Sequence, residues 1–219
     1  IRSFRGSRSY IWLFTGKIKH SRFLRCLILA ILIAATGALT SLTWARCRVW
    51  RDGISLWNDV LIKYPNAVTG YNNRGIDYIE QGNIQEAISN FNKAIEINPK
   101  YAEAYNNRGT IYMKQENIQE AISNFDKAIG IKPKYAEAYN NRGNAYYQQG
   151  NLAQAFSDYD KAIKIDPKYV SAYCSRGTAY SQQGNFTQAI FDLSKAIEID
   201  PDLAEAYNNR AIAYFSAKE

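Results

Sequence analysis

The sequence is poor in the side chains that most enzyme centres use. It has one histidine and three cysteines in 219 residues, and the cysteines lack the spacing of metal ligands. This pattern argues against a zinc site and gives no support for disulfides. The motifs G-x-x-x-x-G-K-[ST] and G-x-S-x-G, which bind phosphate or present a nucleophile, are absent as well. We therefore expect no catalytic residue, metal or cofactor in this chain.

Acidic residues are missing from the first 51 residues, which carry ten Lys or Arg. Residues 52–219 carry seventeen Lys or Arg against twenty Asp or Glu, so the formal charge of +7 arises in the N-terminal part. A nucleic-acid-binding domain would carry a basic face on its folded part, so we expect no nucleic-acid partner. Charge of one sign beside an apolar run indicates a membrane instead.

That apolar run is "CLILAILIAATGALTSLTWA", residues 26–45, and it contains no charge. Twenty helical residues span roughly 30 Å, the thickness of the hydrocarbon core of a bilayer. We expect a transmembrane helix over 26–45 that contacts lipid, preceded by a basic arm over 1–25. A cleavable signal peptide is the alternative, but its basic region would be unusually long and no clean A-x-A site follows. A buried core helix is rarely apolar on all its faces over this length.

The flanking charges indicate an orientation for that helix. Seven Lys or Arg precede the apolar run, and three follow it directly. The positive-inside tendency places the N-terminal arm in the cytoplasm and the remainder on the non-cytoplasmic side, periplasmic or lumenal.

After the apolar run, one motif recurs every 34 residues. "YNNRG" begins at Tyr71, Tyr105 and Tyr139, and returns as "YCSRG" at Tyr173 and "YNNRA" at Tyr207. The units are 68–101, 102–135, 136–169 and 170–203, with a partial unit over 204–219. Each full unit has two stretches of helical periodicity, and a proline ends the second. The period predicts stacked helical hairpins, because one hairpin cannot bury its apolar face alone.

Turn and cap residues support the two helices of each hairpin. Gly82, Gly150 and Gly184 suit the left-handed conformation that ends a helix. An asparagine follows, with Glu or Gln three residues later, which predicts a capping box. The pairs are Asn83 with Glu86, Asn117 with Glu120, Asn151 with Gln154, and Asn185 with Gln188.

Glycine also recurs in the middle of the first helix, where it costs about 1 kcal/mol relative to alanine. A repeated cost indicates a close helix crossing. We expect an alanine of the second helix as its facing partner, for example Ala121 against Gly109. The glycines are Gly75, Gly109, Gly143 and Gly177, and the alanines are Ala87, Ala121, Ala155 and Ala189.

Small and aromatic residues at positions 4, 8, 11, 20, 24, 27 and 32 of the unit resemble the tetratricopeptide repeat (TPR). The resemblance covers residues 68–217 and implies an all-α fold in which a transmembrane helix is followed by a right-handed superhelix of stacked TPR hairpins. Position 7 departs from the family, because it is arginine in every copy: Arg74, Arg108, Arg142, Arg176 and Arg210. We expect each arginine to pack its stem and pair with Asn90, Asn124, Asp158 or Asp192. A ladder of anion-binding arginines is the alternative.

The segment before the first unit, residues 46–67, continues the repeat register. Trp57, Val60 and Pro65 fall at positions 24, 27 and 32, so residues 54–64 are expected to form a lone second helix that caps the stack. The segment also resembles the junction in multi-pass transmembrane TPR proteins of the O-mannosyltransferase-like group, where a membrane helix runs into a similar sequence. The matching residues are Arg46, Val49, Trp50, Asp52, Leu56, Trp57 and Asp59. The chain begins with Ile1 and ends at repeat position 16, so we expect a truncated reading frame or a solitary terminal helix.

In the TPR family the first helices line a concave groove that binds peptides. The resemblance implies that the following residues line this groove: Asn72, Asn73, Asn106, Asn107, Asn140, Asn141, Asn144, Gln148, Asn208 and Asn209. The asparagines at position 6 are similar to the asparagine ladder of O-GlcNAc transferase, and an amide can pair with any peptide backbone. Since water can satisfy them too, we expect them to contribute little to folding, and a soluble filler role is the alternative. The chaperone-binding carboxylate clamp is not expected, because its Lys and Arg are replaced by residues such as Asn72 and Glu137.

These features predict a membrane-anchored TPR scaffold that binds a protein or an extended peptide. The alternative is the C-terminal, substrate-presenting region of a multi-pass membrane glycosyltransferase whose catalytic part lies upstream.

Overall fold

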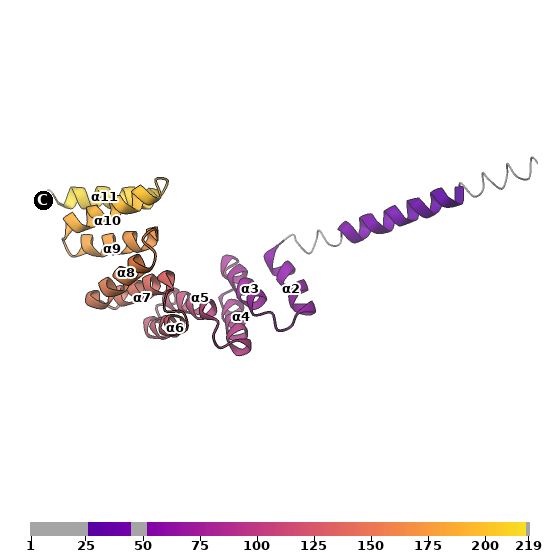
Figure 1. The fold of residues 1–219 in the computed structure, drawn as a ribbon, viewed down its shortest axis with the longest axis horizontal. Coiled ribbons are helices and arrows are strands. Elements are labelled where there is room, and N and C mark those ends of the chain that lie inside the picture. Colours follow the sequence, from indigo (N-terminus) through magenta and orange to yellow (C-terminus); the bar gives the residue numbers. More distant parts are fainter. Residues whose placement is uncertain (1–25, 45–51, 218–219) are drawn as a thin grey trace, which may run out of the picture. The chain divides into compact units, whose positions relative to one another are not determined.

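A computed structural model describes residues 26–44 and 52–217, and in these ranges the regular structure is entirely helical. The chain divides into two compact units, Ile1–Leu56 and Trp57–Glu219. The predicted basic arm, Ala45 and residues 46–51 lie outside the described residues. The all-α fold class and the stacked hairpins of the second unit agree with the sequence prediction (Figure 1).

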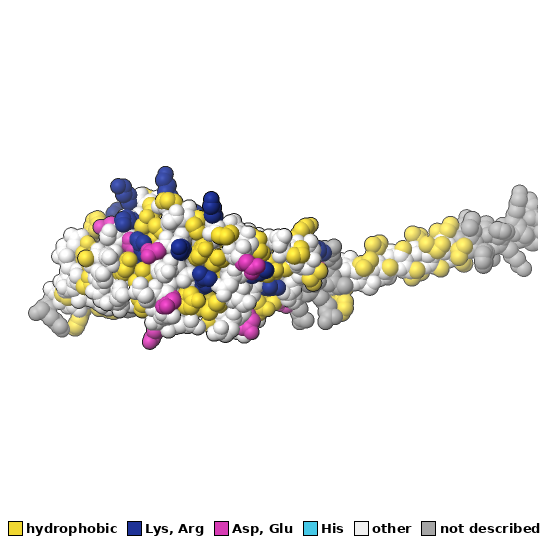
Figure 2. All heavy atoms as spheres, turned by 90° about the horizontal axis from the view of Figure 1, so that it is seen from below, with side chains coloured by type: hydrophobic (Ala, Val, Ile, Leu, Met, Phe, Trp, Pro, Cys, Tyr) yellow, Lys and Arg dark blue, Asp and Glu magenta, His cyan; other side chains and the backbone are white. Residues whose placement is uncertain are grey.

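The helix Cys26–Trp44 corresponds to the predicted membrane span. It is long and apolar enough to cross a membrane by length and composition, with a mean hydropathy of 2.2, and none of it is buried. Figure 2 shows hydrophobic side chains along the whole length of this helix. A signal sequence near an N-terminus shares these properties, so the helix itself establishes only an exposed apolar segment.

The second unit contains paired helices whose bounds fall inside the predicted repeats. A short helix α2 (Gly53–Lys63) comes before them. The hairpins are α3 (Val68–Glu80) with α4 (Ile84–Ile97), α5 (Ala102–Lys114) with α6 (Ile118–Ile131), α7 (Ala136–Gln148) with α8 (Leu152–Ile165), and α9 (Val170–Gln182) with α10 (Phe186–Ile199). The last helix is α11 (Ala204–Ser216).

The turns inside the hairpins follow the predicted backbone conformation. Gly82, Gly150 and Gly184 have φ values of 76°, 80° and 76°, and Glu116 takes the same place with φ of 60°. The predicted capping box is only partly correct. Asn151 and Asn185 accept from the backbone N–H of Gln154 and Gln188 at 3.3 and 3.4 Å, whereas Asn83 and Asn117 make no side-chain cap bond.

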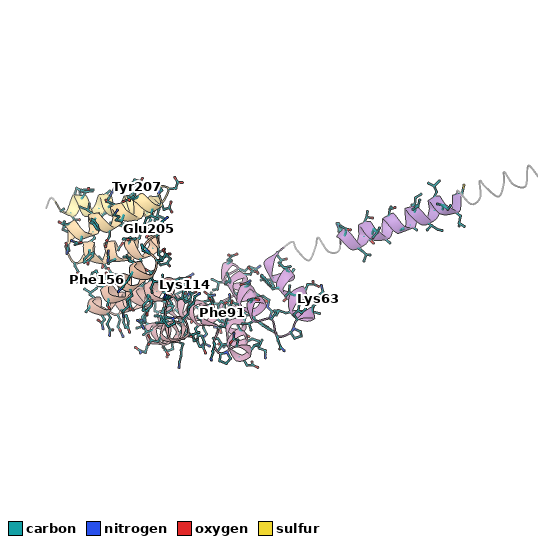
Figure 3. The ribbon with its side chains drawn as sticks, in the orientation of Figure 1. Lys63, Phe91, Lys114, Phe156, Glu205 and Tyr207 are labelled. Atoms are coloured by element: carbon teal, nitrogen blue, oxygen red, sulfur yellow. The ribbon has the colours of Figure 1, made fainter. Side chains whose placement is uncertain are left out.

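The core of each hairpin is formed by alanines and one large side chain of the second helix. Ala121 and Phe125 on α6 are fully buried, as are Ala155 on α8 and Ala87 on α4. Phe91, labelled in Figure 3, takes the same place on α4 that Phe125 takes on α6.

The mid-helix glycines lie closest to the large residue at position 24, a contact that the sequence analysis did not predict. A Cβ at Gly109 would lie 2.7 Å from Cε1 of Phe125, and one at Gly143 would lie 2.7 Å from Cε1 of Tyr159. The glycines therefore make room for the large residue at position 24. The alanine at position 20 lies close as well, since Ala155 O would be 3.3 Å from a Cβ at Gly143 and Ala189 O 3.3 Å from a Cβ at Gly177. The pairing of Gly109 with Ala121 stays a prediction.

The bounds of helix α2 agree with those of the predicted lone second helix, residues 54–64, to within one residue at each end. Leu61 is its buried residue, and a Cβ at Gly70 on α3 would lie 3.0 Å from Leu61 Cδ2. Asn58 accepts a hydrogen bond from Nη1 of Arg74 at 2.7 Å. Leu61 and Asn58 thus contact the first hairpin as the second helix of a repeat would.

Candidate peptide-binding face

The arginines at position 7 connect consecutive units through their second helices. Arg142 on α7 donates from Nε and Nη2 to the two carboxylate oxygens of Asp158 on α8, at 2.7 and 2.8 Å. Its Nη1 donates to Asp126 on α6 at 2.5 Å. Burial would lower the pKa of Arg142, but the hydrogen bonds to Asp158 and Asp126 outweigh it and raise the pKa. Arg142 is therefore a permanent cation held between two carboxylates.

The same bridge recurs along the stack with partners of different charge. Arg176 pairs with Asp192 and Asp160, whereas Arg108 has the neutral partners Asn124 and Asn92. Each guanidinium also lies over the tyrosine of its own motif, and for Arg108 this distance to the Tyr105 ring centroid is 5.5 Å. The predicted pairing of these arginines with the residue at position 23 is confirmed. The pairs are Arg74 with Asn90, Arg108 with Asn124, Arg142 with Asp158, and Arg176 with Asp192. The bonds to the preceding unit were not predicted.

The asparagines at position 5 correct the sequence analysis. Asn72, Asn106 and Asn140 are 4%, 0% and 3% exposed, so they are packed between helices and do not face solvent in an open groove. Adjacent residues of a helix are rotated by about 100° relative to each other, and in these three Asn-Asn pairs the second residue faces outward. The outward residues are Asn73, Asn107 and Asn141, which are partly exposed.

The two positions form a chain of amide hydrogen bonds along the face made by the first helices. Asn107 donates from Nδ2 to Oδ1 of Asn72 in the preceding unit at 3.0 Å. Asn141 does the same to Asn106 at 3.1 Å. The position-6 asparagine therefore satisfies the buried asparagine of the unit before it.

The remaining predicted groove residues have varied surroundings. Asn144 accepts from the hydroxyl of Tyr159 at 2.9 Å, and Asn209 donates to Thr178 at 3.3 Å. Gln148 and Asn208 are exposed. All of them lie on first helices, so the structure brings the predicted residues to one run of helices, α3, α5, α7 and α11.

The amide chain is interrupted at the fourth unit. Cys174 and Ser175 replace the two asparagines there, and Oδ1 of Asn140 is buried without a hydrogen-bond partner. A pocket of about 300 Å³ lies at this junction. Its lining comes from α7, α9, α11 and the residues before them: Glu137, Asn140, Asn141, Asn144, Tyr169, Ser171, Cys174, Ser175, Leu203 and Glu205. The change from "YNNRG" to "YCSRG" was the only signal of this site in the sequence.

Titratable groups beside the pocket have raised pKa values. Burial raises the pKa of the Cys174 thiol to about 11, and the negative charges of Glu205 and Asp200 add to the shift. Burial also raises the pKa of Tyr169, with a further contribution from Glu137. Cys174 and Tyr169 are therefore shielded from water, and the carboxylates near them make the potential negative.

A larger pocket, about 580 Å³, lies against α4 and is lined by Tyr71, Arg74, Lys93 and Glu96 among others. Its charged groups are already paired, since Lys93 contacts Glu96 at 2.8 Å and Arg74 bonds Asn90 and Asn58. In the described part of the chain no group of His, Cys, Asp and Glu could hold a metal ion.

Several solved structures have a similar fold. A structure of MamA is 31% identical, with a TM-score of 0.57, and the match covers 69% of this chain and 89% of that one. The first TPR of Spaghetti (RPAP3), bound to the HSP90 peptide SRMEEVD, is 27% identical over 54% of this chain and 94% of its own, with a TM-score of 0.51. TTC0263, a TPR protein of Thermus thermophilus, is 18% identical over 74% of this chain and 89% of its own, with a TM-score of 0.66. A comparison with curated proteins gave no match.

The family model described as TPR repeat matches four overlapping segments, 75–116, 109–150, 143–184 and 177–217. Together these segments cover more than half of the chain, and they contain the helices α4 to α11 with their hairpin turns. The chain therefore belongs to the tetratricopeptide-repeat family.

Proposed function

We propose that this chain is a membrane-anchored scaffold that binds an extended peptide segment of a partner protein on the face formed by its first helices. The observation that carries the proposal is the row of partly exposed asparagines at position 6, next to a pocket on the same helices. An amide offers both a donor and an acceptor, so a row of amides suits a peptide backbone.

The similarity to the RPAP3 repeat supports a peptide as the ligand, since that structure holds one. The peptide there, SRMEEVD, is acidic. The pocket on this chain is lined by Glu137 and Glu205 and by no Lys or Arg. We therefore expect a ligand of different charge, in line with the absence of a carboxylate clamp.

The helix Cys26–Trp44 supports the anchor. Its few hydroxyl side chains bond to carbonyls of the preceding turn, as Thr36 does to Leu32 and Thr43 to Leu39 at 2.9 and 2.7 Å. Such internal bonds satisfy polar groups that lipid cannot satisfy. With the basic arm in the cytoplasm, the repeats would lie on the periplasmic or lumenal side.

The alternative function, the C-terminal region of a membrane glycosyltransferase, rests on the short motif at 46–59, part of which lies outside the described residues. An upstream sequence with several membrane spans and an acidic loop motif would favour that enzyme. A start codon close to Ile1 would favour the scaffold.

Site-specific photo-crosslinking tests the binding face. A photoreactive residue at the exposed positions Gln148 or Asn208 should capture a partner protein from intact cells, whereas one at Lys127, exposed on α6, should not. Equal capture from both faces would contradict the proposed groove. Retention in the membrane fraction after alkaline carbonate washing tests the anchor separately, and release into the wash would contradict it.

A further inference from the structure

The pocket at the junction of the third and fourth units indicates which part of a peptide the chain recognises. Resting on the proposed function, we propose that this pocket binds the cationic side chain, arginine or lysine, of a peptide that lies on the asparagine face. Three observations support the proposal. Oδ1 of Asn140 is a buried acceptor without a donor, the carboxylates of Glu137 and Glu205 line the pocket, and Glu137 lacks the lysine that pairs with the equivalent Glu103.

The unpaired acceptor is Oδ1 of Asn140. The corresponding oxygens of Asn72 and Asn106 each receive an N–H from the next unit, donated by Asn107 and Asn141. At Asn140 the next unit offers Ser175, and Oδ1 has no partner although Asn140 is only 3% exposed. A buried acceptor without a donor is unfavourable, so a ligand that brings an N–H group gains from entering here.

The carboxylates are those of Glu137 and Glu205, which line the pocket from α7 and α11 and are both exposed to solvent. No Lys or Arg lines the pocket. In the described part of the chain neither carboxylate forms an ion pair. Two carboxylates beside an amide oxygen accept hydrogen bonds and attract positive charge, and an arginine or lysine head supplies both.

The preceding unit shows what is missing. Glu103 occupies the same repeat position as Glu137, and its carboxylate lies 2.9 Å from Nζ of Lys132. One unit later the place of Lys132 is taken by Asp166, so Glu137 has a second acid where Glu103 has a cation. A basic side chain of the ligand would supply the positive charge that Glu137 lacks.

The size and potential of the pocket agree with a single side chain. A volume of about 300 Å³ is at the lower end of small-molecule sites, which suits one side chain better than a cofactor. The raised pKa of Cys174, due first to burial and then to Glu205 and Asp200, indicates negative potential at the pocket wall.

The test uses the full chain in detergent micelles and a displayed library of random twelve-residue peptides. Enriched peptides should share an arginine or lysine. A peptide from the pool is then compared with its analogue in which that residue is citrulline or norleucine, and the analogue should bind about tenfold more weakly. In the double variant Glu137→Gln/Glu205→Gln the two peptides should bind alike. The amide introduced at position 137 can still accept from Asn106, as the Glu137 carboxylate does, so the amide chain is retained.

Two further variants keep the result interpretable. Glu103→Gln makes the same chemical change at the same repeat position but outside the pocket, and it should leave the difference between the peptides unchanged. Ser175→Asn offers an internal donor to Asn140, so it should raise the thermal midpoint while weakening the basic peptide. The double variant should also bind the neutral analogue as tightly as the wild type does, which a variant that fails to fold could not do.

The outcomes separate the two proposals. Enriched peptides without a shared basic residue, or an unchanged preference in the double variant, would overturn the cationic pocket and leave peptide binding standing. A library that yields no enriched peptide would contradict both proposals.

Discussion

Arg142 and Asp158 form a two-pronged ion pair in which Nε and Nη2 donate to the two carboxylate oxygens at 2.7 and 2.8 Å. The Asp158 side chain is 3% exposed, whereas that of Arg142 is 16% exposed. The pair therefore places a nearly buried carboxylate under a guanidinium that still reaches solvent. Replacing Arg142 tests how much this guanidinium contributes to the stability of the stacked repeats.

Arg142→Met should lower the free energy of unfolding by about 3 kcal/mol or more, because it leaves the buried Asp158 charge without its bidentate partner. Arg108→Met, the matched change one unit earlier, leaves the neutral Asn124 and should cost about 1–2 kcal/mol. Urea unfolding of the full chain followed by circular dichroism measures both. Equal midpoints for the two variants would mean that the carboxylate is not dependent on Arg142.

Gly109→Ala should destabilise the protein. The added Cβ would lie 2.7 Å from the fully buried ring of Phe125, and overpacking costs about 1–3 kcal/mol, which exceeds the roughly 1 kcal/mol that alanine gains in a helix. Gly130→Ala is the control, since nothing lies within 4 Å of its Cβ position on α6, and it should raise the thermal midpoint. Opposite signs are expected, and a shared sign would contradict the assigned crossing.

Asn141→Ala should cost about 1–3 kcal/mol, because it removes the donor to Oδ1 of Asn106, which is fully buried. This replaces the expectation from sequence that such asparagines contribute little to folding. Gln148→Ala, an exposed amide on the same helix, should change stability by less than about 0.5 kcal/mol. Thermal melts of the two variants compare them, and an unchanged midpoint for Asn141→Ala would show that water replaces the lost donor.

The thiol of Cys174 should resist alkylation in the native protein. Its pKa is raised to about 11, mainly by burial, so little thiolate exists at pH 9. The neutral thiol is favoured in the folded state, so this stabilising contribution is complete below the unfolded pKa of about 9 and is lost as pH rises through 11. Iodoacetamide labelling at pH 9, followed by peptide mass spectrometry, should be at least about tenfold slower for native than for urea-unfolded protein. Similar rates would mean that Cys174 is solvated.

The sequence predicts the helices and turns of the repeats well, because each rests on local chemistry. Gly82 has the left-handed φ expected after a helix, and Arg142 finds the partner sixteen residues away that the repeat register suggests. The inward rotation of Asn106 depends on how neighbouring helices cross, which no local pattern specifies. The close contact of Gly109 with the ring of Phe125 could not be predicted for the same reason, since it depends on the depth of the crossing.

The unpaired oxygen of Asn140 was beyond sequence reasoning because it depends on a hydrogen bond between units. The pattern shows that Ser175 replaces an asparagine, but it does not show that the asparagine of that position serves the unit before it. Only the observed pairs in the earlier units make the missing donor visible.

The arginine bridge has a consequence for how such a chain changes length. Four arginines, Arg74, Arg108, Arg142 and Arg176, reach a residue sixteen positions before them and another sixteen positions after them, as Arg142 reaches Asp126 and Asp158. Deleting residues 136–169 would bring Arg176 into the place of Arg142. It would then lie sixteen positions after Asp126 and sixteen positions before Asp192, so it would again have two aspartate partners. The charged bridge is thus interchangeable between these units, so this deletion would leave it complete. The amide chain is not interchangeable in this way. After the deletion Ser175 would take the place of Asn141 opposite Asn106, so Oδ1 of Asn106 would be the acceptor without a donor.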